Sequence, residues 1–226
     1  MGKHKASLKH LADMGNSTVS IFDFSEKKQV FYIANLATTL GYSSVEVENS
    51  KGHFLDDKVH PDDFLGLMQN GMLMLKLFLN FSEDEKMNHK LISEYRIRNQ
   101  EGNYVRVIEQ HQALELDGKG NLWLAMSLLD LSPNQGTDEG LKTQLLNYRT
   151  GKYLPIAPRD DIKVSLTSRE KEILQLVKKG FLSKEISDQL SISLHTVNTY
   201  RQRILEKLGV NNSMEAVMLA SRLGLV

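Results

Sequence analysis

The sequence predicts an α+β amino-terminal domain followed by an all-α carboxy-terminal domain. The first part of the chain alternates β-branched and aromatic runs with turn residues and one long helical segment. The last sixty or so residues contain only capped helical segments. Stretches rich in Pro, Gly and polar residues separate the two parts. At 226 residues the chain has room for two domains, each with a core of its own.

β-branched and aromatic runs predict five strands in the first domain, at residues 18–24, 29–33, 91–98, 104–116 and 122–131. The first two strands are close enough to form a hairpin, and short segments with glycine breakers follow them. Pro61, with Asp62 and Asp63 behind it, predicts a helix that runs to about residue 81. Proline suits the first helical turn, and carboxylates suit the positive end of the helix dipole.

This order of elements resembles a PAS domain over residues 17–132. The letters HPDD at the start of the long helix and YRIRNQEGNYVRV across the next hairpin support the resemblance. It implies an antiparallel sheet with flanking helices that senses a small-molecule ligand or binds a protein partner; an unrelated α+β domain of similar order is the alternative. Residues 133–164 are expected to be a linker, in which the flanks of Thr150-Gly151-Lys152 fit a hairpin as well as a connecting helix.

The carboxy-terminal domain, residues 165–226, is predicted to contain four helices. Thr167 and Glu170 have the spacing of a capping box at the start of the first helix. Ser183 can cap a short second helix, and Ser193 can cap a longer third one after a tight connection. A short helix, a tight turn and a longer helix in this order form a helix-turn-helix arrangement.

At 100° per residue the third helix has two different sides. One side is suited to packing on the first two helices and holds Val197, Tyr200, Ile204 and Leu208. The other side holds residues able to hydrogen-bond base edges or phosphates, namely His195, Asn198, Thr199, Gln202 and Arg203. A solvated polar face has a similar composition, so this helix alone leaves both interpretations open.

The stretches LTSREKEILQLVKKG, SKEISDQL and, near the end, EAVMLASRLGL resemble the LuxR (GerE) family of transcriptional regulators over residues 166–226. The sequence departs from the family in Tyr200, where His is usual, and in Ser187, where Ala is usual. The resemblance implies a regulator, not an enzyme, that binds double-stranded DNA. It assigns base contacts to Asn198, Thr199 and Gln202, and phosphate contacts to Ser183, Lys184, Thr196, Arg203 and Lys207.

The last predicted helix, residues 213–223, carries more apolar surface than one docking face can use. The resemblance implies that this helix pairs two subunits of a homodimer, through Val217, Leu219 and Ala220. Such a dimer would place two recognition helices about one DNA turn, ~34 Å, apart. Packing of the surplus apolar residues on the first domain is the alternative.

Composition limits the classes of function. The chain has 28 Lys and Arg against 28 Asp and Glu, whereas residues 165–226 have nine against six, so an affinity for nucleic acid must be local. There is no cysteine, which excludes disulfides and thiolate metal sites and suits a reducing compartment. No apolar run reaches the ~20 residues that a membrane span needs. We therefore expect a cytoplasmic protein that does not contact a membrane.

No cofactor can be named from the sequence, and no spacing pattern indicates catalysis. His60, Asp62 and Asp63 offer metal-like ligands, but the carboxylates stand where a helix amino terminus favours them, so we predict no metal site. A set of apolar residues in the first domain could line a ligand cavity, although packing in the core is the simpler interpretation. These residues are Met68, Met72, Met74, Phe78 and Trp123.

Overall fold

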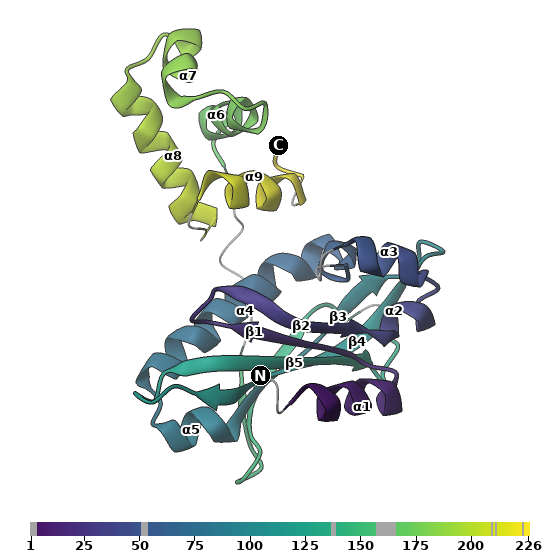
Figure 1. Ribbon diagram of the computed structural model, residues 1–226. Helices are drawn as coiled ribbons and strands as arrows, with labels where there is room; N and C mark the ends of the chain where they lie inside the picture. Colours follow the sequence, from purple (N-terminus) through teal and green to yellow (C-terminus); the bar gives the residue numbers. More distant parts are fainter. Residues whose placement is uncertain are drawn as a thin grey trace. The chain divides into compact units, whose positions relative to one another are not determined.

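The computed structural model describes residues 4–50, 54–136, 139–156, 166–208, 210, 212–222 and 224–226 (Figure 1). The chain divides into two compact units, Met1–Pro158 and Arg159–Val226, and each is considered by itself. Three parts of the sequence predictions lie outside the described residues: the end of the expected linker at 157–164, the first residue of the expected helical domain, and residue 223 of its last helix.

The first unit combines one sheet with helices. Its helices are α1 (Lys5–Gly15), α2 (Asn35–Thr39), α3 (Ser44–Asn49), the 3-10 turn η1 (Asp56–Lys58), α4 (Pro61–Asn80) and α5 (Glu83–Asn88). Its strands are β1 (Thr18–Asp23), β2 (Lys28–Ala34), β3 (His89–Arg98), β4 (Tyr104–Leu116), β5 (Leu122–Leu131), β6 (Lys142–Asn147) and β7 (Lys152–Pro155).

The strands form one antiparallel sheet in the order β2-β1-β5-β4-β3-β6-β7. The predicted α+β class is confirmed, and so is the PAS-like order of a hairpin, short helices, a long helix and three strands. Helices α1 and α5 were not predicted. Helix α1 has no side-chain cap and no acidic residue in its first turn, so the usual signals of a helix start are missing.

The sheet has helices on both faces (Figure 1). Helix α1 covers one face, where Leu8 and Ala12 pack with residues of β1 and β5. On the opposite face, residues of α2 and the segment before η1 pack with Tyr95, Ile97 and Val107, and α4 packs through Met74 against β3, β4 and β6. Because side chains alternate along a strand, Glu109 of β4 lies on this second face with Val107.

The expected linker contains strands β6 and β7, so the structure adopts the hairpin rather than the helix. Their turn is closed by Asn147, whose Oδ1 accepts hydrogen bonds from the amides of Arg149 and Thr150, each at 3.1 Å. Gly151 takes the left-handed conformation, with φ of 69°, that glycine adopts without strain. Strand β6 pairs with β3, from His89↔Asn147 to Glu94↔Lys142, and so extends the sheet.

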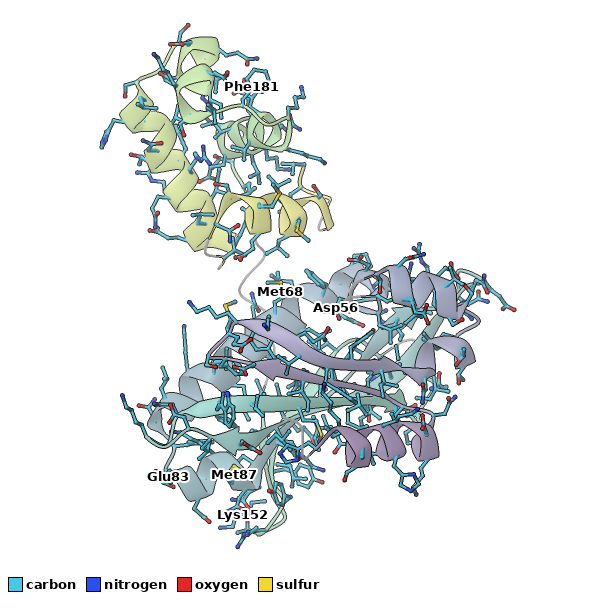
Figure 2. All side chains as sticks on the ribbon, in the orientation of Figure 1. Asp56, Met68, Glu83, Met87, Lys152 and Phe181 are labelled. Carbon is cyan, nitrogen blue, oxygen red and sulfur yellow. The ribbon has the colours of Figure 1, made fainter. Side chains whose placement is uncertain are left out.

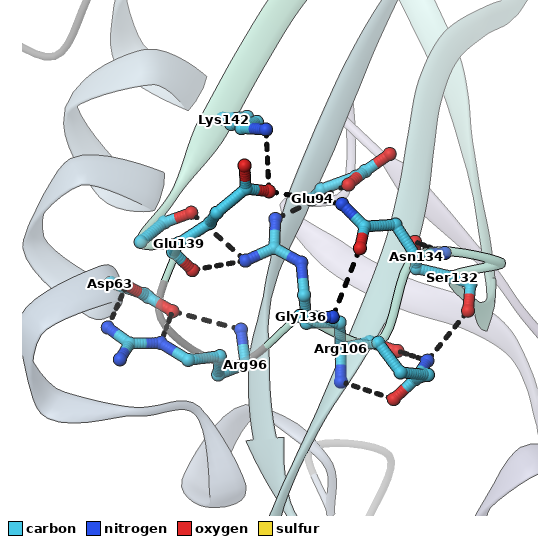
Figure 3. A network of polar contacts seen from close by, with 11 residues as sticks. Asp63, Glu94, Arg96, Arg106, Ser132, Asn134, Gly136, Glu139 and Lys142 are labelled. Carbon is cyan, nitrogen blue, oxygen red and sulfur yellow. Dashed lines mark hydrogen bonds and ion pairs between the residues drawn. The ribbon is translucent and has the colours of Figure 1, made fainter.

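A buried polar network joins α4, β3, β4 and the loop after β5 (Figure 3). Asp63 accepts hydrogen bonds from the Arg96 amide and Nε, both at 2.9 Å, and from Nη2 at 2.7 Å. The guanidinium of Arg106, which is fully buried, donates to the carbonyls of Glu139 and Gly140. Asp63 therefore has a structural role, and no cluster of three metal-ligating side chains occurs among the described residues.

The second unit consists of α6 (Ser168–Lys178), α7 (Ser183–Leu190), α8 (Leu194–Leu208) and α9 (Ser213–Arg222). The predicted all-α domain of four helices is confirmed. Its core is built from apolar residues of all four helices, among them Ile173, Ile186, Val197, Ile204 and Leu219. In the described part of the chain, no helix combines the length and the hydropathy that crossing a bilayer would require.

Candidate nucleic-acid interface

Polar caps determine where the helices of the second unit begin. Thr167 and Glu170 form the predicted capping box: the Glu170 amide donates to the Thr167 hydroxyl at 3.3 Å, and the Thr167 amide donates to the Glu170 carboxylate at 2.7 Å. Ser193 caps α8 as predicted, accepting from the Thr196 amide at 3.0 Å. The prediction that Ser183 caps α7 is wrong. Ser183 is the first residue of α7, after the N-cap Leu182.

The connection between α7 and α8 spans three residues. Ser191 takes a left-handed conformation with φ of 51° and ends α7. The Ser187 hydroxyl of α7 then donates to the Ile192 carbonyl at 2.6 Å. Ser187 is one of the two departures from the LuxR pattern, and this bond gives it a role: it ties α7 to the turn that determines how α8 leaves it.

Helix α8 has the two sides that the sequence predicts. Val197, Ile204 and Leu208 are buried in the core of the unit, whereas Tyr200, the other departure from the family pattern, is half-buried. The opposite side, at the amino-terminal half of the helix, exposes His195, Asn198, Gln202 and Arg203. The polar face therefore points into solvent, as a recognition helix requires.

The three residues predicted to contact bases differ in how far they are already engaged. The side chain of Asn198 is exposed and has no hydrogen-bond partner in the described part of the chain. The Thr199 hydroxyl donates to the His195 carbonyl of its own helix at 3.0 Å. Gln202 donates from Nε2 to Glu206 Oε1 at 3.0 Å. Asn198 thus offers its full amide to a ligand, and Gln202 must give up one bond to do so.

The residues predicted to contact phosphates fall into two groups. Lys184 and Arg203 are exposed and have no ion pair or side-chain hydrogen bond among the described residues. Three others have intramolecular partners. Ser183 accepts from Arg201 Nη1 at 2.7 Å, the Thr196 hydroxyl lies 2.8 Å from that of Ser193, and Lys207 Nζ lies 2.7 Å from Glu170 Oε2.

The ion pair of Lys207 connects α8 to the start of α6. Burial by itself would raise the pKa of Glu170, but hydrogen bonds from Lys207 and Thr167 outweigh it, so the pKa lies below the ordinary value of a glutamate. Glu170 is therefore charged at neutral pH and holds the Lys207 ammonium. A phosphate at Lys207 would have to share that ammonium with a buried carboxylate.

Arg201 is a structural residue of this surface that sequence reasoning missed. Its guanidinium donates to the Ser183 hydroxyl at 2.7 Å and to the Ser213 hydroxyl at 2.8 Å, so it joins α8 to the amino termini of α7 and α9. The signal was available in the sequence. At 100° per residue Arg201 falls on the side of Val197 and Ile204, where an arginine needs hydrogen-bond acceptors.

The residues predicted to form the dimer contact differ in their exposure. Leu219 is 2% exposed and Ala220 is fully buried, both within their own unit, and the assignment of these two residues to a subunit interface stays a prediction. Helix α9 contacts both α6 and α8, which accounts for their burial. Val217 is half-buried, and its assignment stays a prediction. The exposed apolar residues of α9 are Met214 and Met218.

The first unit has a separate polar cluster on the face of its sheet that α2 and α4 cover. Glu109 accepts hydrogen bonds from the hydroxyls of Tyr95, at 2.9 Å, and Ser127. His111 Nε2 lies 3.3 Å from the same carboxylate, and its buried Nδ1 has no hydrogen-bond partner within the described ranges of the chain. Burial, and then the charge of Glu109, raise the pKa of Tyr95 well above its ordinary value, so this hydroxyl remains a donor.

Tyr32 extends this cluster toward η1, where Asp56 is labelled in Figure 2. Burial and the charge of Asp56 raise the pKa of Tyr32 to about 12. The apolar residues that could line a cavity, or pack in the core, lie elsewhere. Met74 and Phe78 are core residues, Met68 and Met72 are half-buried, and the Trp123 indole donates to Asp23 at 3.2 Å. The core interpretation holds for Met74 and Phe78.

The second unit is similar to known bacterial regulatory proteins. Residues 164–220 match the luxR family of bacterial regulatory proteins, GerE. The chain is 46% identical over 59 residues to the uncharacterized response regulatory protein YgeK of Escherichia coli K12, covering 26% of this chain and 40% of that protein. It is 49% identical over 59 residues to the transcriptional regulatory protein DesR of Bacillus subtilis, covering 26% of this chain and 30% of DesR. The match thus spans less than half of either relative.

Two solved structures are also similar. The transcription factor GerE is 42% identical, with 26% of this chain and 90% of GerE covered, at a TM-score of 0.26. The phage VqmA-DPO complex is 16% identical over 100% of this chain and 91% of that chain, at a TM-score of 0.36. The sequence identity to GerE, over nearly its whole length, concerns the helical unit alone.

Proposed function

Because the carboxy-terminal domain of this chain belongs to the luxR family of bacterial regulatory proteins, we propose that the protein is a sequence-specific, DNA-binding transcriptional regulator of the cytoplasm. It acts as a homodimer on double-stranded DNA, and its amino-terminal unit receives the input. The proposal is supported most by the exposed face of α8, where Asn198 and Arg203 have no partners among the described residues.

The chemistry of this face fits duplex DNA. Asparagine and glutamine amides can each bind adenine with two hydrogen bonds, which suits Asn198 and Gln202 for reading bases in the major groove. Lys184 at the start of α7 and Arg203 on α8 supply charges that release counterions from phosphates.

Salt titration of duplex binding tests the proposal. The full chain is titrated with a fluorescent promoter duplex, and log Kd is followed against log salt concentration by anisotropy. Lys184→Ala and Arg203→Ala should each reduce the slope by about one, because each removes one phosphate contact. Lys119→Ala, which removes the same charge from an exposed turn of the first unit, is the matched control and should leave the slope unchanged. Equal slopes for all four proteins would contradict the proposal.

The input at the first unit is, by our proposal, a small polar ligand that binds at Glu109. The carboxylate, the Tyr95 and Ser127 hydroxyls and the His111 Nδ1, which has no partner among the described residues, together offer donors and acceptors on the face of the sheet that α2 and α4 cover. A ligand that binds one dimer geometry more tightly than another shifts the population toward that geometry. This would couple the ligand to DNA affinity.

Native mass spectrometry of the freshly purified chain tests the ligand proposal. The wild type should carry a small molecule that Glu109→Gln loses and Glu101→Gln, in an exposed turn, retains. A bound molecule that survives in Glu109→Gln would refute the assignment of the site. Absence of a small molecule, together with one stoichiometric protein that co-purifies, would favour the alternative function: a constitutive DNA binder whose first unit recruits that protein.

A further inference from the structure

Helix α4 presents an apolar surface on the side that faces away from the sheet. The side toward the sheet is buried and includes Asp63, Asn70, Met74 and Phe78. At 100° per residue, the opposite side is centred on Met72. A solvent-facing helix side normally carries polar residues, but this one is apolar over most of its length.

The apolar residues of this outer side are Leu65, Met68, Met72, Leu75 and Leu79, and we refer to them as the α4 seam. Leu75 is 41% exposed and Leu79 is 83% exposed, whereas Leu65, Met68 and Met72 are half-buried. Met68 is labelled in Figure 2. The spacing of the seam is three, four, three, four, which is the a and d pattern of a heptad repeat. Such a seam packs best against a second helix with the same repeat.

The charged residues that flank the seam indicate which helix that is. Asp62, Gln69 and Lys76 each follow a d position, so they occupy the e positions from the start of α4 to its end. The Asp62 side chain is 79% exposed, with His60 Nδ1 3.8 Å away. Lys76 is exposed and has no ion pair in the described part of the chain.

Two such helices complement each other in only one orientation. When they run antiparallel, e positions face e positions, so Asp62 of one copy meets Lys76 of the other, twice, with Gln69 opposite Gln69 between them. When they run parallel, e positions face g positions, and the g residues Phe64, Gly71 and Phe78 carry no charge. The antiparallel arrangement also opposes the two helix dipoles favourably.

We propose that the α4 seam is a self-association surface, on which α4 of a second copy of this chain packs antiparallel. Leu65 packs against Leu75 of the second copy, Met68 against its Met72, and the Asp62 and Lys76 pairs flank these layers. Helix α4 has 20 residues and extends ~30 Å, which is long enough for four such layers. This interface lies in the first unit and is distinct from the contact expected at α9.

Sedimentation equilibrium of the full chain without DNA tests the seam. Leu75→Lys and Leu73→Lys form a matched pair, because Leu73 is 39% exposed on the same helix but lies off the seam. Because the symmetric dimer contains two Leu75 contacts and the substitution removes both, Leu75→Lys should raise the dimer dissociation constant at least about ten-fold. Leu73→Lys should leave it within about two-fold of the wild type. Circular dichroism checks that both variants are folded.

A charge swap tests the partner and its orientation. Asp62→Lys and Lys76→Asp should each weaken the dimer, and the double variant should restore it to near the wild-type dissociation constant. A monomeric wild type, equal effects of Leu75→Lys and Leu73→Lys, or a double variant weaker than both single variants would each overturn the proposal. Duplex binding is measured on the same samples. A dimer that depends on the α4 seam but does not bind DNA would refute the proposed function and would not affect this inference.

Discussion

Two neighbouring residues of α9, Leu219 and Met218, should differ greatly in how much their replacement lowers the stability of the second unit. Leu219 is 2% exposed in the core between α9, α6 and α8, whereas Met218 beside it is 58% exposed. A buried leucine replaced by alanine costs about 2–5 kcal/mol, from lost burial and from the cavity left behind. A unit of this size has a total stability of about 3–9 kcal/mol, so Leu219→Ala removes a large part of it. Met218→Ala should change it by less than about 0.5 kcal/mol.

Hydrogen exchange read by mass spectrometry on peptides of α8 reports the opening free energy of this unit inside the full chain. Peptides of β4, in the first unit, are the internal control and should exchange at the wild-type rate in both variants. If Leu219→Ala left the exchange of α8 unchanged and instead raised the dimer dissociation constant, the burial of Leu219 would be wrong. The sequence-based assignment of Leu219 to a subunit contact would then stand.

Three further outcomes are expected. Ser187→Ala, which restores the usual family residue, should lower the opening free energy of α8 by about 0.5–1.5 kcal/mol in the same exchange measurement, because the hydrogen bond to the turn is lost. Glu170→Gln should destabilise the second unit most at neutral pH. The pKa of Glu170 is lower in the folded state than in the unfolded state, so its carboxylate stabilises the fold above the unfolded pKa of about 4.3. This stabilisation is lost as the pH falls through the folded-state pKa. Urea denaturation of both proteins from pH 7 to 3 checks that the difference narrows. Arg106→Met should lower the thermal midpoint of the first unit sharply, since two carbonyls lose their donor, while the exposed Arg98→Met should not.

Local patterns were sufficient to predict the strands of the first unit that pair with sequence neighbours, because β-branched residues and turn chemistry act over short distances. The hairpin of β6 and β7 could not be chosen over a helix in the same way. Strand β6 is held by pairing with β3, about fifty residues earlier in the sequence, and β7 pairs with β6, so no local signal encodes the contact with β3. Helix α1 depends similarly on Leu8 and Ala12 packing against the sheet.

In the candidate site, too, local patterns predicted some features, whereas contacts between distant residues could not be predicted. Helical periodicity correctly separated the buried Val197 and Ile204 from the exposed Asn198, since one helix has one periodic pattern. For α9 the subunit contact was inferred from the family resemblance, and the apolar residues on more than one side of the helix gave no periodic pattern that separates the buried Leu219 from the exposed Met218. The pair of Lys207 with Glu170 joins residues 37 positions apart and follows only from the packing of α8 on α6.

Selection of bound sequences from a pool of random duplexes tests the central claim most directly. The wild type, Asn198→Ala, Gln202→Ala and Lys184→Ala are each subjected to the same selection. The wild type should enrich one motif. The Asn198 and Gln202 variants should relax the preference at particular base positions, with a loss of binding free energy of about 1–3 kcal/mol each. The Lys184 variant should keep the motif and bind all sequences more weakly by the same factor. No enriched motif for the wild type, or a motif that is unchanged in the Asn198 and Gln202 variants but altered in the Lys184 variant, would contradict that claim.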